Sequence, residues 1–333
     1  MDADELEERL WAAFHPETVR QVGRVRQQNI RFVHYTSAES GIAILRSKRM
    51  LLRNSTLLND FSEVQHGMNC LSYAWHSDQG TRLKAILQSV QPDLPEVLQN
   101  NFDGMFMDFR TETYLISVSE HGDPSGDQFK DAFGRLSMWR AYAGKNGIAF
   151  VFHNTPFVTE SNVLDAFTSP VVYATPETFM PHFTELVDGI EAIRDVITPW
   201  GGAWLHENLV NAFRFAIQST KHPAFREERE WRVIYNPTHL KKDPAEWAKQ
   251  LEKVPTEIMT LTGVPQRVFA IPFKSYPEEG FVGATIPELV DRVLIGPSAD
   301  AYAIARAFIA ELNECGVADA EKRVMVTNIP LRT

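Results

Sequence analysis

The sequence predicts an α+β fold built around central mixed or antiparallel sheets. Short runs of aromatic and β-branched residues, typical of strands, recur along the chain. Stretches with apolar residues at helical spacing separate these runs both early and late. No internal repeat or flexible linker interrupts the pattern. We therefore expect a single domain at 29–333, preceded by a helical segment at 1–28 and carrying a helical insertion at about 176–218.

Apolar side chains three and four residues apart predict the helices. In the first helix, Leu6, Leu10 and Phe14 form such a stripe. Thr36 or Ser37 is expected to cap the helix that follows the first strand. Helices are expected at 3–14 and 17–28, after Ser37, at 61–75, in patches within 81–109, and at 136–143, 176–218 (with a break near 199–202), 244–251 and 299–315.

The strands are predicted from composition, because β-branched and aromatic residues fit a pleated and half-buried surface. They are expected at 30–35, 50–52, 113–119, 148–152, 171–173, 231–235, 267–273, 291–295 and 323–327.

Composition narrows the class of protein. The 333 residues are 44% hydrophobic and 23% charged, which is ordinary for a globular protein with a large core. A formal net charge of -10 argues against a broad basic surface for duplex nucleic acid. Cys70 and Cys315 are far apart and suggest neither a disulfide framework nor a metal site. The N-terminus lacks a secretory signal and no apolar run could span a membrane, so a cytoplasmic protein is expected.

The stretch 225–235, FREEREWRVIY, is the most unusual of the predicted strands. Along a strand, alternate side chains point to the same face, so Glu228, Glu230 and Arg232 are expected to share one. Two interpretations are open. The residues form a solvated face with an ion pair, or they form the wall of a cleft whose carboxylates act on a cationic or sugar-like centre.

Two further groups of residues are candidates for ligand binding. His34, Tyr35 and Thr36 end a strand, where the imidazole is placed either to bond a ligand or to be satisfied by a backbone carbonyl. Ser117 and Ser119 share a face of the strand at 113–119.

Trp139 and Tyr142 lie three residues apart, on one face of a short predicted helix. This aromatic pair sandwiches a flat ring or simply plugs the sheet.

Other kinds of site are disfavoured. The sequence Asn59-Asp60-x-x-Glu63, with His66 one helical turn later, matches half of a di-metal motif, but such sites need a second copy. Helix capping explains Asn59 or Asp60 better, and no metal site is expected. The glycine patterns of dinucleotide-binding and phosphate-binding loops are absent from the sequence.

Taken in order, the motifs HYT, NDFSE, SVSE, MWRAYAGKNGIAF, FREEREWRVIY and VLIGP resemble those of a bacterial domain family of unknown function. The resemblance covers roughly residues 31–330. It implies no activity.

A second resemblance is to ADP-ribosyltransferases, and it implies a split-sheet fold with NAD as the substrate. The matching positions begin with His34 of the HYT strand and end with the Glu-x-Glu pair of Glu228 and Glu230. In between, Ser117 or Ser119 matches the second-strand serine of that family. The other positions implied to contact NAD are Tyr35, Thr36, Trp139, Tyr142 and Arg232.

The resemblance also implies roles for these side chains. Glu230 would stabilise an oxocarbenium-like ribosyl cation, as carboxylates do in glycosidases. Glu228 would orient or deprotonate the acceptor. His34 would hold a ribose and Tyr142 would stack on nicotinamide. Arg232 would pair with the diphosphate or fix the rotamer of Glu230.

The expected function is therefore NAD-dependent ADP-ribosyl transfer or NAD glycohydrolysis, in a bacterial toxin or a phage-defence effector. Two alternatives stay open: a non-catalytic module that senses a nucleotide or binds a partner, and a metal-dependent hydrolase that uses the paired glutamates. The sequence does not indicate the acceptor or the oligomeric state.

Overall fold

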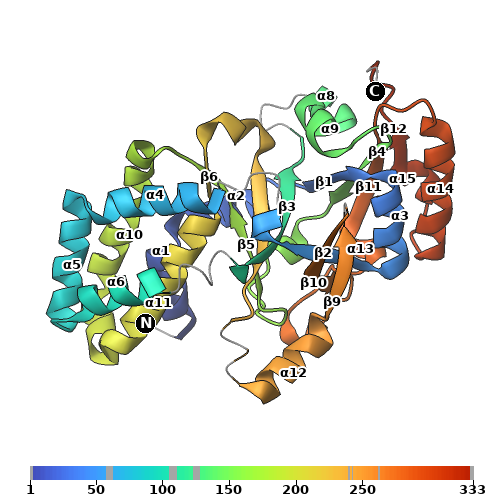
Figure 1. Ribbon diagram of the computed structural model, residues 1–333. Helices are drawn as coiled ribbons and strands as arrows, with labels where there is room; N and C mark the ends of the chain where they lie inside the picture. Colours follow the sequence, from blue (N-terminus) through green and yellow to red (C-terminus); the bar gives the residue numbers. More distant parts are fainter. Residues whose placement is uncertain are drawn as a thin grey trace. The chain divides into compact units, whose positions relative to one another are not determined.

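The computed structural model describes residues 3–57, 63–104, 111–122, 128–238, 241, 243–261 and 263–330 (Figure 1). The chain divides into two compact units, each built from three separate stretches. We call Met1–Arg24, Ser55–Thr113 and Ser169–Arg226 the helical unit. We call Val25–Asn54, Tyr114–Thr168 and Glu227–Thr333 the sheet unit. Helices and strands are both abundant and the large sheet is mixed, so the predicted α+β class is confirmed.

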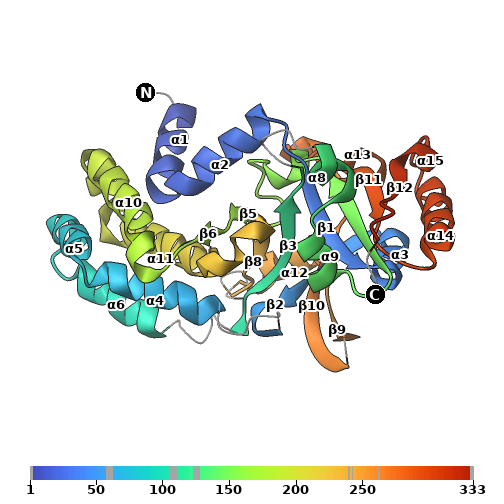
Figure 2. The same ribbon diagram turned by 90° about the horizontal axis from the view of Figure 1, so that it is seen from above.

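The helical unit packs its helices around one apolar core. Its helices lie side by side in both views (Figures 1 and 2). Phe183, Ile190, Leu209 and Phe213 are among the buried residues of this core. Its elements are α1 (Ala3–Phe14), the first part of α2 (Pro16–Gln27), η1 (Ser55–Leu57), α4 (Glu63–Trp75), α5 (Asp78–Val90), α6 (Leu94–Gly104), β6 (Val172–Tyr173), α10 (Pro176–Ile197), η3 (Thr198–Trp200), α11 (Gly201–Gln218) and β7 (Thr220–Lys221).

The insertion expected at 176–218 is therefore a pair of long helices. Thr175 and Thr178 form a capping box at the start of α10, and each side chain bonds the backbone of the other residue. The predicted break near 199–202 is present as η3, which ends at Trp200 and is capped by Gly201 with φ of 84°. A φ in this range favours glycine because a Cβ would be strained there.

The sheet unit is organised around a ten-stranded sheet. Its main path follows the order β12, β11, β4, β1, β3, β2, β10, β9, and β8 joins it through pairs with β3 and β5. The strands are β1 (Phe32–Ser37), β2 (Arg49–Asn54), β3 (Tyr114–Glu120), β4 (Gly147–Phe152), β5 (Ala166–Pro170), β8 (Glu230–Tyr235), β9 (Thr256–Leu261), β10 (Val264–Pro272), β11 (Val290–Ile295) and β12 (Val324–Val326).

Helices cover both faces of this sheet. Ser37 caps α3, since its side chain accepts a bond from the Ser40 amide. The helices and 3-10 turns of the unit are α3 (Ala38–Ser47), α8 (Gln128–Phe133), α9 (Leu136–Tyr142), η2 (Thr155–Phe157), α12 (Pro244–Lys253), η6 (Pro277–Glu279), α13 (Ile286–Leu289), α14 (Ala301–Glu314) and α15 (Ala320–Arg323). Among the described residues, no helix is both long and apolar enough to cross a membrane.

The two faces of the sheet carry separate clusters. On the face that we call the α9 face, Val33 and Tyr35 of β1 pack with Trp139 of α9. On the opposite face, which we call the α14 face, Phe150 of β4 packs with Phe308 of α14. Side chains alternate between these two environments along each strand.

Strand β3 carries the irregularity that shapes the site. One of its edges pairs with β8 along nearly the whole strand. Its other edge pairs with β1 only at Phe32 and Val33, and with β2 only at Arg53 and Asn54. The strands β1 and β2 therefore diverge along the middle of β3.

Candidate functional site

All the side chains predicted to form the site belong to the sheet unit. The register of β3 with β8 places Ser117 opposite Arg232 and Ser119 opposite Glu230. Residues that lie directly opposite in a sheet share a face. Ser119 also pairs with Val33, which belongs to the α9 face. These two serines, Glu230 and Arg232 therefore form one polar group on the α9 face.

Glu230 is held at both carboxylate oxygens. Arg232 donates from Nε to Oε1 at 2.9 Å and from Nη2 to Oε2 at 3.2 Å. The Ser117 hydroxyl also donates to Oε1. The Glu230 and Arg232 side chains are only 6% and 3% exposed. A buried pair of this kind fixes the position of both groups, because separating them leaves an uncompensated charge. Of the two expected roles for Arg232, fixing the rotamer of Glu230 is the one that these contacts support.

A bend separates Glu230 from Glu228. Glu228 ends a 3-10 turn, η4 (Pro223–Glu228), and β8 begins at Glu230. Arg229 between them has φ of 46°, in the left-handed region. The expected strand alternation is therefore confirmed for Glu230 and Arg232, whereas Glu228 precedes the strand. The left-handed residue turns the chain before the strand starts.

Contacts to Glu120, the last residue of β3, hold this bend. Arg229 donates from its guanidinium to the Glu120 carboxylate, and Trp231 donates from Nε1 to the same group at 3.1 Å. The Glu120 amide donates to the Arg229 carbonyl at 3.0 Å. Sequence reasoning did not select Glu120, although it ends the SVSE motif. Its role depends on a residue more than one hundred positions away.

Glu228 lies against the end of α9. The Tyr142 hydroxyl donates to Glu228 Oε1 at 2.7 Å. Arg135 Nη1 donates to the Glu228 carbonyl at 3.3 Å, and the Arg135 amide donates to the Tyr35 hydroxyl at 3.0 Å. Tyr142 and Glu228 are partly exposed, whereas Glu230 is buried. The partly exposed groups that this region offers to a ligand thus include one carboxylate and one phenol.

Trp139 is part of the apolar core on the α9 face of the sheet. Its side chain is 2% exposed, donates from Nε1 to the Phe133 carbonyl at 2.7 Å, and meets Tyr35 edge to face at 4.9 Å between ring centroids. A Cβ on Gly296 would lie 2.7 Å from the Trp139 ring, so the first residue of the Gly-Pro turn after β11 has to be glycine. Of the predicted aromatic pair, Tyr142 reaches Glu228 and Trp139 belongs to the core.

His34 and Thr36 are on the other face. They pair with Phe150 and Ile148 of β4, both of which lie in the core of the α14 face. His34 Nδ1 is 3.0 Å from the Ser117 carbonyl, in the gap where β1 leaves β3. A carbonyl only accepts, so Nδ1 carries the proton and donates. Burial lowers the pKa of His34, and the bond to Ser117 opposes that shift. The imidazole thus supports the backbone of Ser117 and does not join the Glu230 side chain.

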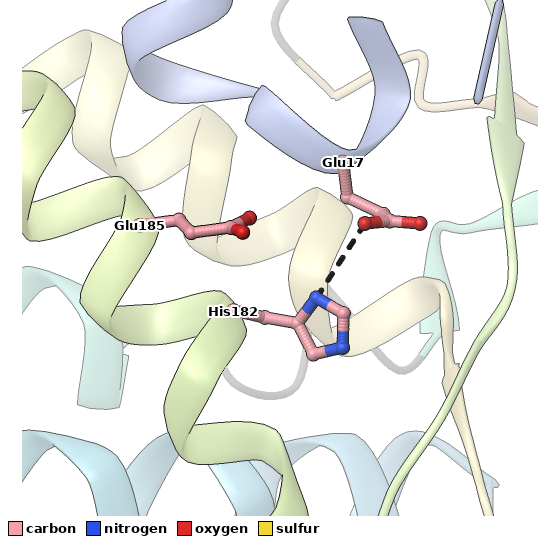
Figure 3. A group of neighbouring side chains, drawn as sticks. All are labelled: Glu17, His182 and Glu185. Atoms are coloured by element: carbon pink, nitrogen blue, oxygen red, sulfur yellow. Dashed lines mark ion pairs between the residues drawn. The ribbon is translucent and has the colours of Figure 1, made fainter. Parts of the chain in front are cut away.

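One group of side chains among the described residues has the spacing of a metal site, and it lies in the helical unit. The ligand atoms of Glu17, His182 and Glu185 lie within 4.8 Å of one another (Figure 3). The Arg20 guanidinium already bonds both carboxylates. A cation in the same place would compete with that arginine. The paired glutamates of the sheet unit belong to no such group among the described residues.

The Asn-Asp-x-x-Glu motif can be placed only in part. Asn59 and Asp60 lie outside the described residues, as does the side chain of Glu63, the first residue of α4. His66 Nε2 lies 2.8 Å from the Ala174 carbonyl, so backbone satisfies this imidazole.

Comparison with known proteins gives one result. Residues 138–233 match the family model described as "Protein of unknown function (DUF2971)". The expected resemblance to an uncharacterised family is thereby confirmed for this segment, which contains Trp139, Tyr142 and both glutamates. His34 lies outside it. No curated protein and no solved structure matches the chain.

Proposed function

We propose that the sheet unit binds NAD and cleaves its nicotinamide–ribose bond, passing the ADP-ribosyl group to an acceptor or to water. One observation carries this proposal. Glu228 and Glu230 stand on either side of a bend, where one carboxylate is fixed by Arg232 and the other bonds the Tyr142 hydroxyl. Two carboxylates in different surroundings can take different roles in the cleavage of a glycosidic bond.

The proposed chemistry follows the charges. As the bond between C1′ and the nicotinamide nitrogen breaks, its electron pair leaves with nicotinamide and the ribose becomes a cation. A carboxylate that is already oriented stabilises this cation without further reorganisation, and Glu230 is oriented by two residues. Glu228 takes the proton from the attacking hydroxyl of the acceptor or of water. The Tyr142 ring offers an aromatic face beside Glu228 for nicotinamide.

His34 has a different part in this proposal from the one that the resemblance implied. Its side chain lies on the α14 face and bonds the Ser117 carbonyl. Ser117 in turn bonds Glu230. His34 therefore acts as a positioning residue that supports β3 behind the carboxylate.

The direct test is the release of nicotinamide from NAD by the purified full-length chain. We expect release by the wild type, a loss of about a hundredfold or more for Glu228→Gln and for Glu230→Gln, and a smaller loss for Tyr142→Phe. Because Glu230 is buried with Arg232, Glu230→Gln will also lower stability. The unfolding curve of each variant therefore has to be measured alongside. A wild-type chain that neither binds nor cleaves NAD refutes the proposal.

A non-catalytic nucleotide-binding module is the second candidate, and the burial of Glu230 favours it. A carboxylate with both oxygens bonded to its own protein is less available to a ribosyl cation. In that case NAD raises the melting temperature of the wild type without release of nicotinamide. The same two measurements therefore separate the two functions.

An enzyme that consumes NAD suits a bacterial toxin or a phage-defence effector. On this proposal, expression of the wild type arrests bacterial growth and lowers cellular NAD. Glu228→Gln, expressed to the same level, does neither. Growth arrest by both proteins would contradict an effector role that depends on this chemistry.

A further inference from the structure

A cavity of about 90 Å³ lies in the helical unit, at the edge of its core. Helices α10 and α11 supply eight of its nineteen wall residues, and the others come mainly from the end of α1, the start of α2, α4 and the short strands on either side of the helix pair. The wall is mainly aromatic and aliphatic, with Phe179, Phe183, Phe213 and Phe215 among its residues. Half-enclosed apolar cavities with a few polar groups are the usual form of a small-molecule site.

Two polar atoms of the cavity wall have no hydrogen-bond partner among the described residues. They are the Ser219 hydroxyl and His182 Nδ1, and both are buried. The whole Ser219 residue is only 4% exposed. Its backbone is satisfied, because its amide bonds Phe215 and its carbonyl accepts from Val172. Native proteins seldom leave a buried polar atom unpaired, so the Ser219 hydroxyl indicates that something else supplies its bond, whereas His182 Nδ1 already faces the Glu17 carboxylate.

The charged groups at the cavity are already neutralised. Glu17 bonds Arg20. The Glu17 carboxylate also forms an ion pair with His182 Nδ1, at 3.7 Å; this pair is the dashed line in Figure 3. Burial lowers the pKa of His15, a further wall residue, to about 4, so this imidazole is neutral near pH 7. Among the described residues, a charged ligand would find no unpaired counter-ion at this cavity, and it would lose its hydration.

We propose that this cavity binds a small uncharged molecule with one aromatic ring and one hydroxyl, of the phenol class. The phenylalanine rings of the wall take the ring in edge-to-face contacts. The Ser219 hydroxyl bonds the hydroxyl of the ligand. The volume limits the buried part of the ligand to at most one ring, since a larger apolar cavity of about 150 Å³ binds a single benzene. The site belongs to the helical unit and does not depend on NAD chemistry.

The test uses phenol and benzene, which differ by the hydroxyl alone. Calorimetric titration of the full-length wild type with phenol is expected to show saturable binding in the millimolar range. Benzene is expected to bind roughly 2- to 12-fold more weakly, the equivalent of one net hydrogen bond. Ser219→Ala reduces the affinity for phenol to that for benzene and leaves the affinity for benzene unchanged.

A second pair of variants tests the location. Ala216 lines the cavity, so Ala216→Leu is expected to fill it and abolish the binding of both probes. Ala310 is exposed on α14, in the other unit, and Ala310→Leu is expected to bind both probes as the wild type does. If Ala216→Leu does not fold, the affinities of Ser219→Ala for phenol and benzene still test the proposal. The proposal is overturned if the wild type does not bind phenol saturably, binds benzene equally well, or if either cavity variant binds phenol as the wild type does.

Discussion

Arg232 and Glu230 lie two residues apart on one strand and bond each other at both carboxylate oxygens, with neither side chain more than 6% exposed. Spacing by two is what brings them together, because alternate residues of a strand share a face. The pair is consequently a fixed part of the sheet and not a solvated surface contact.

Removing the cation of this pair is expected to destabilise the protein strongly. Arg232→Met leaves the Glu230 carboxylate buried without its partner, which costs about 3–5 kcal/mol. Denaturant unfolding, followed by circular dichroism, measures the loss. Arg20→Met is the matched control. Arg20 is half exposed beside Glu185, so its loss is expected to cost less than about 1 kcal/mol. Similar losses for the two variants would contradict the buried pair.

Gly296 and Gly23 are expected to respond to alanine in opposite directions. At Gly296 a Cβ would meet the Trp139 ring at 2.7 Å, so Gly296→Ala forces the ring to shift and costs about 1–3 kcal/mol. At Gly23, inside α2, nothing lies within 4 Å of the new Cβ. Gly23→Ala is therefore expected to stabilise by about 0.5–1 kcal/mol. The melting temperature should fall for Gly296→Ala and rise for Gly23→Ala. An unchanged melting temperature for Gly296→Ala would mean that the Trp139 ring can move aside at no cost in free energy.

Stability is expected to fall as the pH drops below about 6.5. Burial, with Arg31 nearby, lowers the pKa of His121 to about 4 from its ordinary 6.5. Between these two pH values the unfolded chain binds a proton at His121 that the native state does not bind. The contribution of His121 to the free energy of unfolding is therefore full above pH 6.5 and decreases toward pH 4. At pH 5 this one histidine accounts for a loss of about 2 kcal/mol.

The measurement is the free energy of unfolding at pH 7 and pH 5. His121→Gln should lose about 2 kcal/mol less than the wild type over this interval. His76 is exposed, and His76→Gln should retain the pH dependence of the wild type. An unchanged pH dependence in His121→Gln would show that His121 is protonated in the native state.

Cys70 is expected to be unreactive in the native state. It is fully buried, and burial together with Glu177 raises the pKa of its thiol to about 11. The thiolate is the reactive species, and at pH 8 it amounts to about one part in a thousand. In a Cys315→Ser background, a disulfide reagent should label Cys70 only when denaturant is added. Rapid labelling of the native protein would contradict this burial.

Features determined by neighbouring residues could be predicted from the sequence. The stripe of Leu6, Leu10 and Phe14 predicted α1, and the hydroxyl of Ser37 predicted a cap that is present. The strands β4 and β8 follow from runs rich in aromatic and β-branched residues. Helix periodicity and capping act within one or two turns, so one sequence suffices to detect them.

Features determined by distant residues could not be predicted. The bend at Arg229 depends on Glu120, which lies on another strand. The face on which His34 lies depends on its register with β4, and a shift of one residue would have reversed it. Trp139 is confined to the core partly by Gly296, from a turn 157 residues later. Strand β9 was missed because its sequence, TEIMTL, alternates too weakly to stand out from a loop.

The interleaving of the two units has a consequence for biosynthesis. The chain leaves one unit for the other after residues 24, 54, 113, 168 and 226. Neither unit is complete early in translation, since the helical unit needs the chain as far as Arg226 and the sheet unit needs it nearly to the C-terminus. Strand pairs such as β1 with β4 join residues more than one hundred positions apart, and such contacts form slowly. The nascent chain will therefore expose apolar surface for longer than a chain of two consecutive domains. The segment 138–233, expressed alone, lacks the pairing strands β1 and β3 and is not expected to fold.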